Sequence, residues 1–84
     1  MIDWKVRADE LLAEYDLVIV AKPKSNAVDI QLEKDVVSKW AYHLATQRSW
    51  GTETEIAEAC HQLETRLRSL KQKVVFEILK HGTV

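Results

Sequence analysis

An uninterrupted heptad pattern in the C-terminal third is the feature that most constrains the fold of this chain. Neither glycine nor proline occurs between Thr52 and His81, so we expect one helix over about residues 52–80, roughly 43 Å long at 1.5 Å per residue. Its apolar residues alternate at spacings of four and three, which is typical of a helix that packs against other helices. These residues, the heptad stripe, are Ile56, Cys60, Leu63, Leu67, Leu70 and Val74.

Helix breakers divide the remaining residues into two shorter helical segments. Asp3 suits the N-cap of a first helix. Pro23 lacks a backbone N–H and restrains the residue before it, so this helix is predicted to end by about residue 21. Ser25 or Asn26 can cap a second helix that extends to about residue 48, and Gly51 separates it from the third. Thr52 with Glu55 then has the spacing of a capping box.

Both shorter segments carry apolar residues at helical intervals, as expected for helices with one buried face. In the first segment these are Trp4, Ala8, Leu11, Leu12, Tyr15, Val18 and Ile19. In the second segment they are Ile30, Val36, Val37, Trp40, Ala41, Leu44 and Ala45.

The chain is therefore predicted to be one domain over residues 1–84, an all-α three-helix antiparallel bundle with a long heptad-patterned C-terminal helix. Short loops favour antiparallel neighbours. The composition agrees, because 46% of the residues are apolar and only two glycines and one proline occur, unlike a disordered tail or a sheet-rich domain. A chain of 84 residues also excludes a two-domain enzyme with a separate cofactor module.

The first and third helices should end at the same pole, where both segments are apolar on nearly all sides. Residues 17–21 are an unbroken apolar run, and residues 74–79 include Val74, Val75, Phe76, Ile78 and Leu79. A helix of this kind is normally buried all round, but the third helix exceeds the second by roughly 10 Å and leaves this pole without cover in one chain. The β-branched residues of 17–20 and 74–76 also fit a pair of short strands.

The charge is balanced overall and uneven along the chain. A net charge of −1 argues against a surface devoted entirely to nucleic acid or membrane binding. Residues 1–20 carry −3 and residues 61–81 carry +3, which indicates oppositely charged helices packed side by side or, alternatively, a basic binding face. No apolar run approaches the roughly 20 residues that span a bilayer, and the start lacks a signal-peptide pattern. We expect a cytoplasmic protein without membrane association.

No catalytic, cofactor-binding or metal-binding motif is found, so we expect no enzyme and no cofactor. Cys60 is the only cysteine, which excludes an internal disulfide and a multi-cysteine metal cluster. We expect Cys60 in the core and His43 and His61 on the surface. Trp40 lies on the apolar face of the second helix, and Trp50 either caps the bundle or faces a partner.

Six residues, Glu55-Ile56-Ala57-Glu58-Ala59-Cys60, resemble the first helix of helix-turn-helix regulators. In those proteins a glycine turn and a recognition helix follow. Here His61-Gln62-Leu63 replaces the turn glycine and the heptad stripe continues through it. The resemblance implies a DNA-binding regulator that uses residues 55–73, with a basic nucleic-acid face made of Arg66, Arg68, Lys71 and Lys73.

Our leading hypothesis is a non-enzymatic protein–protein interaction module, such as an adaptor or inhibitor. It would form a homodimer or dock a helical partner through the apolar pole of residues 17–21 and 74–79, which would enlarge a core that is marginal at this size. The candidate interface residues are Val18, Ile19, Val20, Val75, Phe76, Ile78, Leu79 and Trp50.

Overall fold

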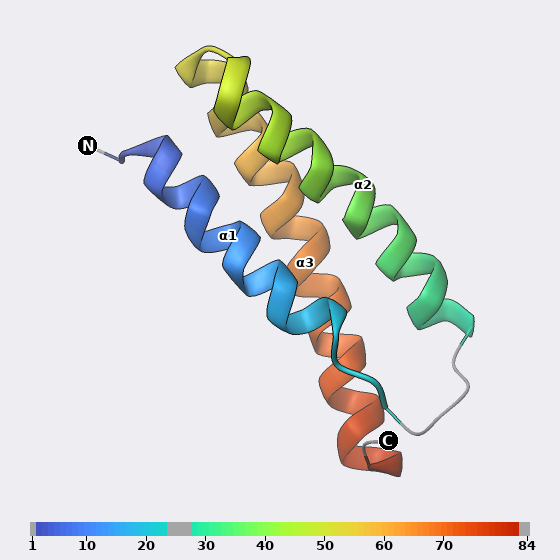
Figure 1. Cartoon of the computed structure of the whole chain (residues 1–84). Helices are drawn as coiled ribbons and strands as arrows, with labels where there is room; N and C mark the ends of the chain where they lie inside the picture. The colour runs from blue at the N-terminus through green and yellow to red at the C-terminus, as the bar shows by residue number, and fades with distance from the viewer. Residues whose placement is uncertain (1, 24–27, 83–84) are drawn as a thin grey trace.

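The computed structural model describes residues 2–23 and 28–82, and these form three helices (Figure 1). They are α1 (Trp4–Ile19), α2 (Val28–Trp50) and α3 (Glu53–His81). Helices α1 and α3 run in one direction and α2 runs in the other, which confirms the predicted all-α antiparallel bundle. Residues 17–19 and 74–76 are helical, so the alternative of two short strands is wrong. The predicted caps Ser25 and Asn26 lie outside the described residues.

Asp3 caps α1 as predicted. Its carboxylate accepts hydrogen bonds from the backbone N–H groups of Lys5 (3.1 Å) and Val6 (3.3 Å), two donors that a first helical turn leaves without helical partners. Helix α1 ends at Ile19, and the chain beyond it is fixed by Lys34, whose ammonium donates to the Ala21 carbonyl at 2.7 Å. The side chain of this lysine is buried, so α2 holds the end of α1 through a polar contact.

The predicted capping box starts α3. The Glu55 N–H donates to the Thr52 hydroxyl (3.3 Å), and the Thr52 N–H donates to the Glu55 carboxylate (3.0 Å). At the other end Gly82 has a φ of 84° and its N–H donates to the Ile78 carbonyl at 2.7 Å. A positive φ favours glycine because it has no Cβ, and this explains why α3 ends there.

We expect Thr52→Ala to lower the free energy of unfolding by about 1 kcal/mol. The substitution removes the hydroxyl that accepts from Glu55 at the start of α3. Urea denaturation followed by circular dichroism measures the change. Thr54→Ala, at an exposed position just inside the same helix, is the control and should stay within about 0.5 kcal/mol of the unmodified chain. Equal losses in the two variants would contradict a capping role.

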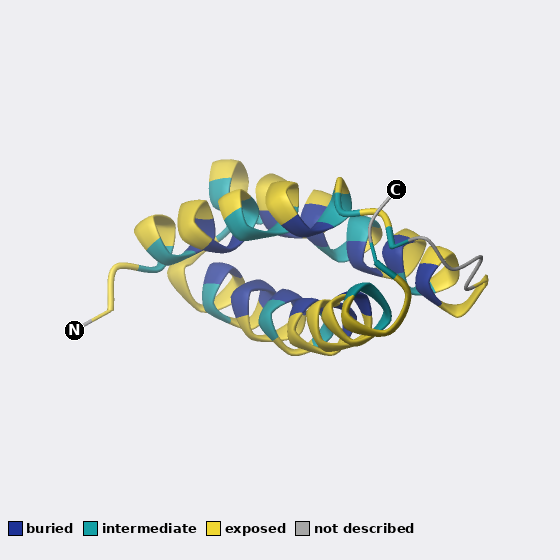
Figure 2. Ribbon diagram, turned by 90° about the horizontal axis from the view of Figure 1, so that it is seen from below, coloured by how far each residue is buried: buried dark blue, intermediate teal, exposed yellow. Residues whose placement is uncertain are grey.

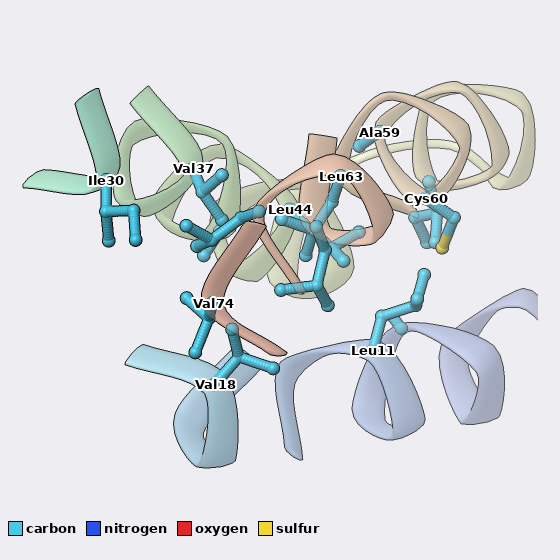
Figure 3. Close-up of a cluster of buried hydrophobic side chains, with 14 residues drawn as sticks. Leu11, Val18, Ile30, Val37, Leu44, Ala59, Cys60, Leu63 and Val74 are labelled. Carbon is cyan, nitrogen blue, oxygen red and sulfur yellow. The ribbon is translucent and has the colours of Figure 1, made fainter. Parts of the chain in front are cut away.

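Helix α3 supplies half of the core, seven of its fourteen buried apolar residues. All six residues of the heptad stripe are buried, each no more than 3% exposed, and α3 contributes seven buried residues against three from α1. Viewed from below, α1 and α2 form one layer and α3 the other (Figure 2). The buried side chains of all three helices meet between these layers (Figure 3). A single apolar stripe therefore packs against two neighbouring helices.

Two predicted core positions of α2 are wrong. Val36 is 44% exposed and Ala45 is exposed as well, whereas Ile30, Val37, Ala41 and Leu44 are buried. Trp40 is half-buried and packs against the core cluster, as does Trp4 on α1. The side of α2 that carries Val36 consequently faces away from the core.

Ion pairs connect the oppositely charged segments, which confirms that these helices pack side by side. The Arg7 guanidinium of α1 lies 3.2 Å from the Glu64 carboxylate of α3. Further along both helices, the Lys71 ammonium of α3 donates to the Glu14 carboxylate of α1 at 3.2 Å. These pairs link α1 to α3 at two points along their length.

Candidate protein-interaction surface

The rotation of α1 and α3 against one another decides which apolar side chains reach the surface at the pole where both helices end. One turn beyond the Glu14–Lys71 pair, Val18 and Val74 point toward one another in the core (Figure 3). Both are buried, at 8% and 3% exposure. Leu17 and Val75, the residues beside them in sequence, turn outward and remain 75% and 46% exposed. The same packing that buries one pair thus exposes the other.

At this end of the bundle, residues 17–20 and the last turns of α3 expose five large apolar side chains, which we call the apolar pole. Phe76 is 61% exposed and Leu79 is 82% exposed on the last turns of α3, and Val20 is 68% exposed after α1. In Figure 1 this end of α3 continues beyond the end of α1. The full set is Leu17, Val20, Val75, Phe76 and Leu79.

The predicted interface residues fall into three groups. Val20, Val75, Phe76 and Leu79 are exposed at the apolar pole. Val18 is buried in the core, so its assignment to an open surface is wrong, and Ile19 and Ile78 are half-buried, with Ile78 packed against the core. Trp50 is 87% exposed but lies at the C-terminal end of α2, at the pole opposite to the other residues.

A second apolar surface, which the sequence did not predict, lies on α2. Val28 is 71% exposed, Leu32 is 60% exposed and Val36 is 44% exposed, and these residues recur at every fourth position. Together with the half-buried Trp40 they form what we call the α2 ridge. Beside the ridge a groove of about 470 Å³ runs between α2 and α3, lined by Leu32, Val36, Arg66, Ser69 and Lys73 among others. The four-residue spacing marks a second apolar row in the sequence, but only the packing of α2 shows that this row is exposed.

One ion pair crosses the groove. The Lys73 ammonium of α3 lies 2.5 Å from the Glu33 carboxylate of α2. Burial acts to raise the pKa of Glu33, but hydrogen bonds from Lys73 and Ser69 outweigh it and hold the pKa below its ordinary value. The hydrogen bond to Glu33 in turn raises the pKa of Lys73. Both groups are therefore charged at neutral pH and hold α2 and α3 together.

Acid is expected to weaken the bundle through Glu33 and Glu55. A hydrogen bond from the Thr52 backbone N–H lowers the pKa of Glu55, as the contacts above do for Glu33. A carboxylate whose pKa is lower in the folded state contributes stability above its unfolded pKa, and this stability is lost as the pH falls through the folded value. Melting temperatures should therefore fall progressively below about pH 4.3. In the double variant Glu33→Gln with Glu55→Gln, the melting temperature should fall less steeply as the pH is lowered. An unchanged pH dependence would show that these two carboxylates are not the source of the acid sensitivity.

The four residues of the predicted nucleic-acid face are already engaged within the bundle. The Arg66 guanidinium lies 4.8 Å from the centre of the Trp40 ring. Arg68 pairs with Glu64 at 3.1 Å, and Lys71 and Lys73 pair with Glu14 and Glu33. Three of the four positive charges thus face carboxylates.

The helix-turn-helix geometry is also absent from residues 55–73. This segment lies within one continuous helix, α3, and Leu63 and Leu67 are 0% and 2% exposed in the core. The turn that would precede a recognition helix is not formed, so the resemblance of residues 55–60 does not extend to the fold.

Cys60, His43 and His61 lie where the sequence predicts them, Cys60 in the core and the two histidines at the surface. Cys60 is fully buried, its thiol lies 3.9 Å from the Trp4 carbonyl, and burial raises the pKa of the thiol, which disfavours the reactive thiolate. His43 and His61 are exposed, with their rings edge-on to Trp40 and Trp4 at 5.7 and 5.3 Å. Within residues 2–23 and 28–82, His, Cys, Asp and Glu side chains form no group of three that could hold a metal ion.

The chain matches no family model, no curated protein and no solved structure. In the part of the chain that the structure describes, each helix is too short or too polar to cross a bilayer.

Proposed function

We propose that this protein is a non-enzymatic interaction module that binds a helical segment of a protein through the apolar pole. The observation that carries the proposal is the exposure of Leu17, Val20, Val75, Phe76 and Leu79 around the ends of α1 and α3. Single exposed apolar residues are ordinary, but a group of five large ones at one end of a small bundle is typical of an interaction site.

The character of the pole favours a protein partner. Val75, Phe76 and Leu79 occupy adjacent positions over about one turn of α3 and offer aliphatic and aromatic surface to an amphipathic helix. The Lys80 ammonium lies 5.9 Å from the Phe76 ring and adds a cation at the rim. An apolar centre with a charged rim is the usual anatomy of a protein interface. The segment that binds belongs to a second copy of the chain or to a different protein.

We place this module in the cytoplasm, as an adaptor, an inhibitor or a subunit of a larger assembly. Its single cysteine is buried and free, which suits a reducing compartment. A DNA-binding regulator is a weaker alternative because three of its four candidate cations pair with carboxylates. That alternative predicts a salt-sensitive gel shift with duplex DNA.

Photo-crosslinking in the source cell tests the apolar pole directly. A benzophenone amino acid is placed at position 79 in the full chain and, as the matched control, at position 58 on an exposed turn at the other end of α3. We expect protein adducts at position 79 that Phe76→Lys strongly reduces, and no comparable adducts at position 58. Equal yields at the two positions, or a yield at position 79 that Phe76→Lys leaves unchanged, would overturn the proposal.

A further inference from the structure

We infer that the segment bound at the apolar pole is an acidic amphipathic helix of another protein, with carboxylates beside its apolar stripe. This inference rests on the proposed function, because it names the chemistry of the partner at the same surface. The acidic segment of this chain, residues 1–20, is already packed against α3 as part of the bundle. The inference comes from the charges that surround the exposed apolar residues of α3.

One exposed row of α3 continues from the apolar pole toward the middle of the helix. It consists of exposed residues at spacings of four, three and four, namely Arg68, Gln72, Val75 and Leu79. Residues at this spacing stay on one face of a helix. A partner helix that lies along α3 over Val75 and Leu79 therefore also passes over Arg68.

Lysines lie on both sides of this row. Lys71 is on the side of α1, where its ammonium donates to the Glu14 carboxylate at 3.2 Å. On the side of α2, Phe76 lines a cleft of about 460 Å³ together with Ile30, and the Lys80 ammonium lies 5.9 Å from the centre of the Phe76 ring. A helix docked on the row is thus flanked by an ammonium group on either side.

The ion pairs beside the row turn their positive ends toward solvent. The side chain of Arg68 is 69% exposed, against 34% for its partner Glu64. The corresponding fractions are 56% for Lys71 and 40% for Glu14. Glu64 also pairs with Arg7 at 3.2 Å, so one carboxylate is shared between two guanidinium groups. An approaching helix therefore meets the cations before it meets the carboxylates.

Acidic side chains are scarce along the last turns of α3. The only one after Glu64 is Glu77, which is half-buried and lies 3.5 Å from His81. Lys80 in the same stretch is exposed, and none of the ion pairs among the described residues includes it. The outward side of α3 thus presents more positive than negative charge to a partner.

The other two helices also carry exposed carboxylates toward this end, Asp16 on α1 and Asp29 on α2. Neither belongs to the row on α3, so the partner's carboxylates are expected over Arg68, Lys71 and Lys80. A carboxylate placed there is attracted, whereas an ammonium group in the same place is repelled.

Three synthetic helical peptides that share one leucine stripe test the charge preference. Each has about 15 residues, the length at which an alanine-rich helix forms in water, and its positions beside the stripe are all glutamate, all glutamine or all lysine. Fluorescence anisotropy measures the binding of each peptide to the full chain at low salt. We expect the glutamate peptide to bind at least about tenfold more tightly than the lysine peptide, with the glutamine peptide between them. This difference should shrink as salt is added.

Lys80→Glu tests the charged side of the pole. It should weaken binding of the glutamate peptide by about three- to tenfold and strengthen binding of the lysine peptide. Lys5→Glu is the matched control, since it makes the same change at an exposed position near the start of α1, and it should leave both affinities unchanged. Circular dichroism checks that the two variants keep their helix content.

The outcomes separate this inference from the proposed function. Equal binding of the three peptides that Phe76→Lys abolishes overturns the acidic preference and supports the apolar pole as a binding site. Tighter binding of the lysine peptide, or no binding of the glutamate peptide, also overturns the preference, and the crosslinking at position 79 then decides the proposed function separately. Binding of the peptides that Phe76→Lys leaves unchanged contradicts both.

Discussion

Leu63→Ala is expected to lower the free energy of unfolding by about 2–5 kcal/mol. Leu63 is 0% exposed and lies at the centre of the heptad stripe, where its side chain points into the space shared by the three helices (Figure 3). Truncation removes buried methyl groups and leaves a cavity that packed helices fill only in part. A domain of this size has little reserve, because total stabilities of about 5–15 kcal/mol are typical and small domains bury the least surface.

Urea denaturation at a fixed low chain concentration measures this loss. Leu79→Ala is the matched control, since it removes the same atoms from a side chain that is 82% exposed, and it should change stability by less than about 0.5 kcal/mol. Similar losses for the two variants would mean that the heptad stripe does not form the core.

Lys34→Met is expected to have the second-largest effect, a loss of about 1–3 kcal/mol. Methionine retains most of the apolar stem of Lys34, which is 8% exposed. It cannot donate to the Ala21 carbonyl, which the ammonium contacts at 2.7 Å, and a half-buried carbonyl then loses its partner. Lys5→Met, at an exposed position on α1, is the control, and thermal melts compare the two. A Lys34→Met variant as stable as the unmodified chain would show that the contact adds nothing to the fold.

The long helix and the bundle could be predicted because their signals lie within single segments. The heptad stripe specifies α3 without reference to the rest of the chain, and the capping pair Thr52 and Glu55 forms as its spacing requires. Pro23 and Gly51 mark the two connections for equally local reasons, namely a missing N–H and a missing side chain.

The surfaces could be predicted only in part because they depend on how the helices are rotated against one another. Helix α2 has two apolar rows, one with Val37 and Leu44 and one with Leu32 and Val36, and periodicity alone does not say which row faces α3. The structure buries the first and exposes the second. At the apolar pole, Val18 and Leu17 are equally apolar neighbours, and only the rotation of α1 against α3 decides that Val18 is buried and Leu17 is exposed. A lysine in the core was not expected, because lysine is almost never buried without a partner.

Because the three helices contribute unequally to the core, we expect them to detach in a definite order when the bundle unfolds. Helix α1 has three buried residues, the fewest of the three helices, so its backbone amides should exchange with solvent through the opening of lowest free energy. Each opening leaves α2 and α3 as a hairpin and uncovers the Cys60 thiol beneath the Trp4 carbonyl. The rate at which a thiol reagent modifies Cys60 would therefore report how often α1 detaches from α2 and α3, which is the first step of unfolding.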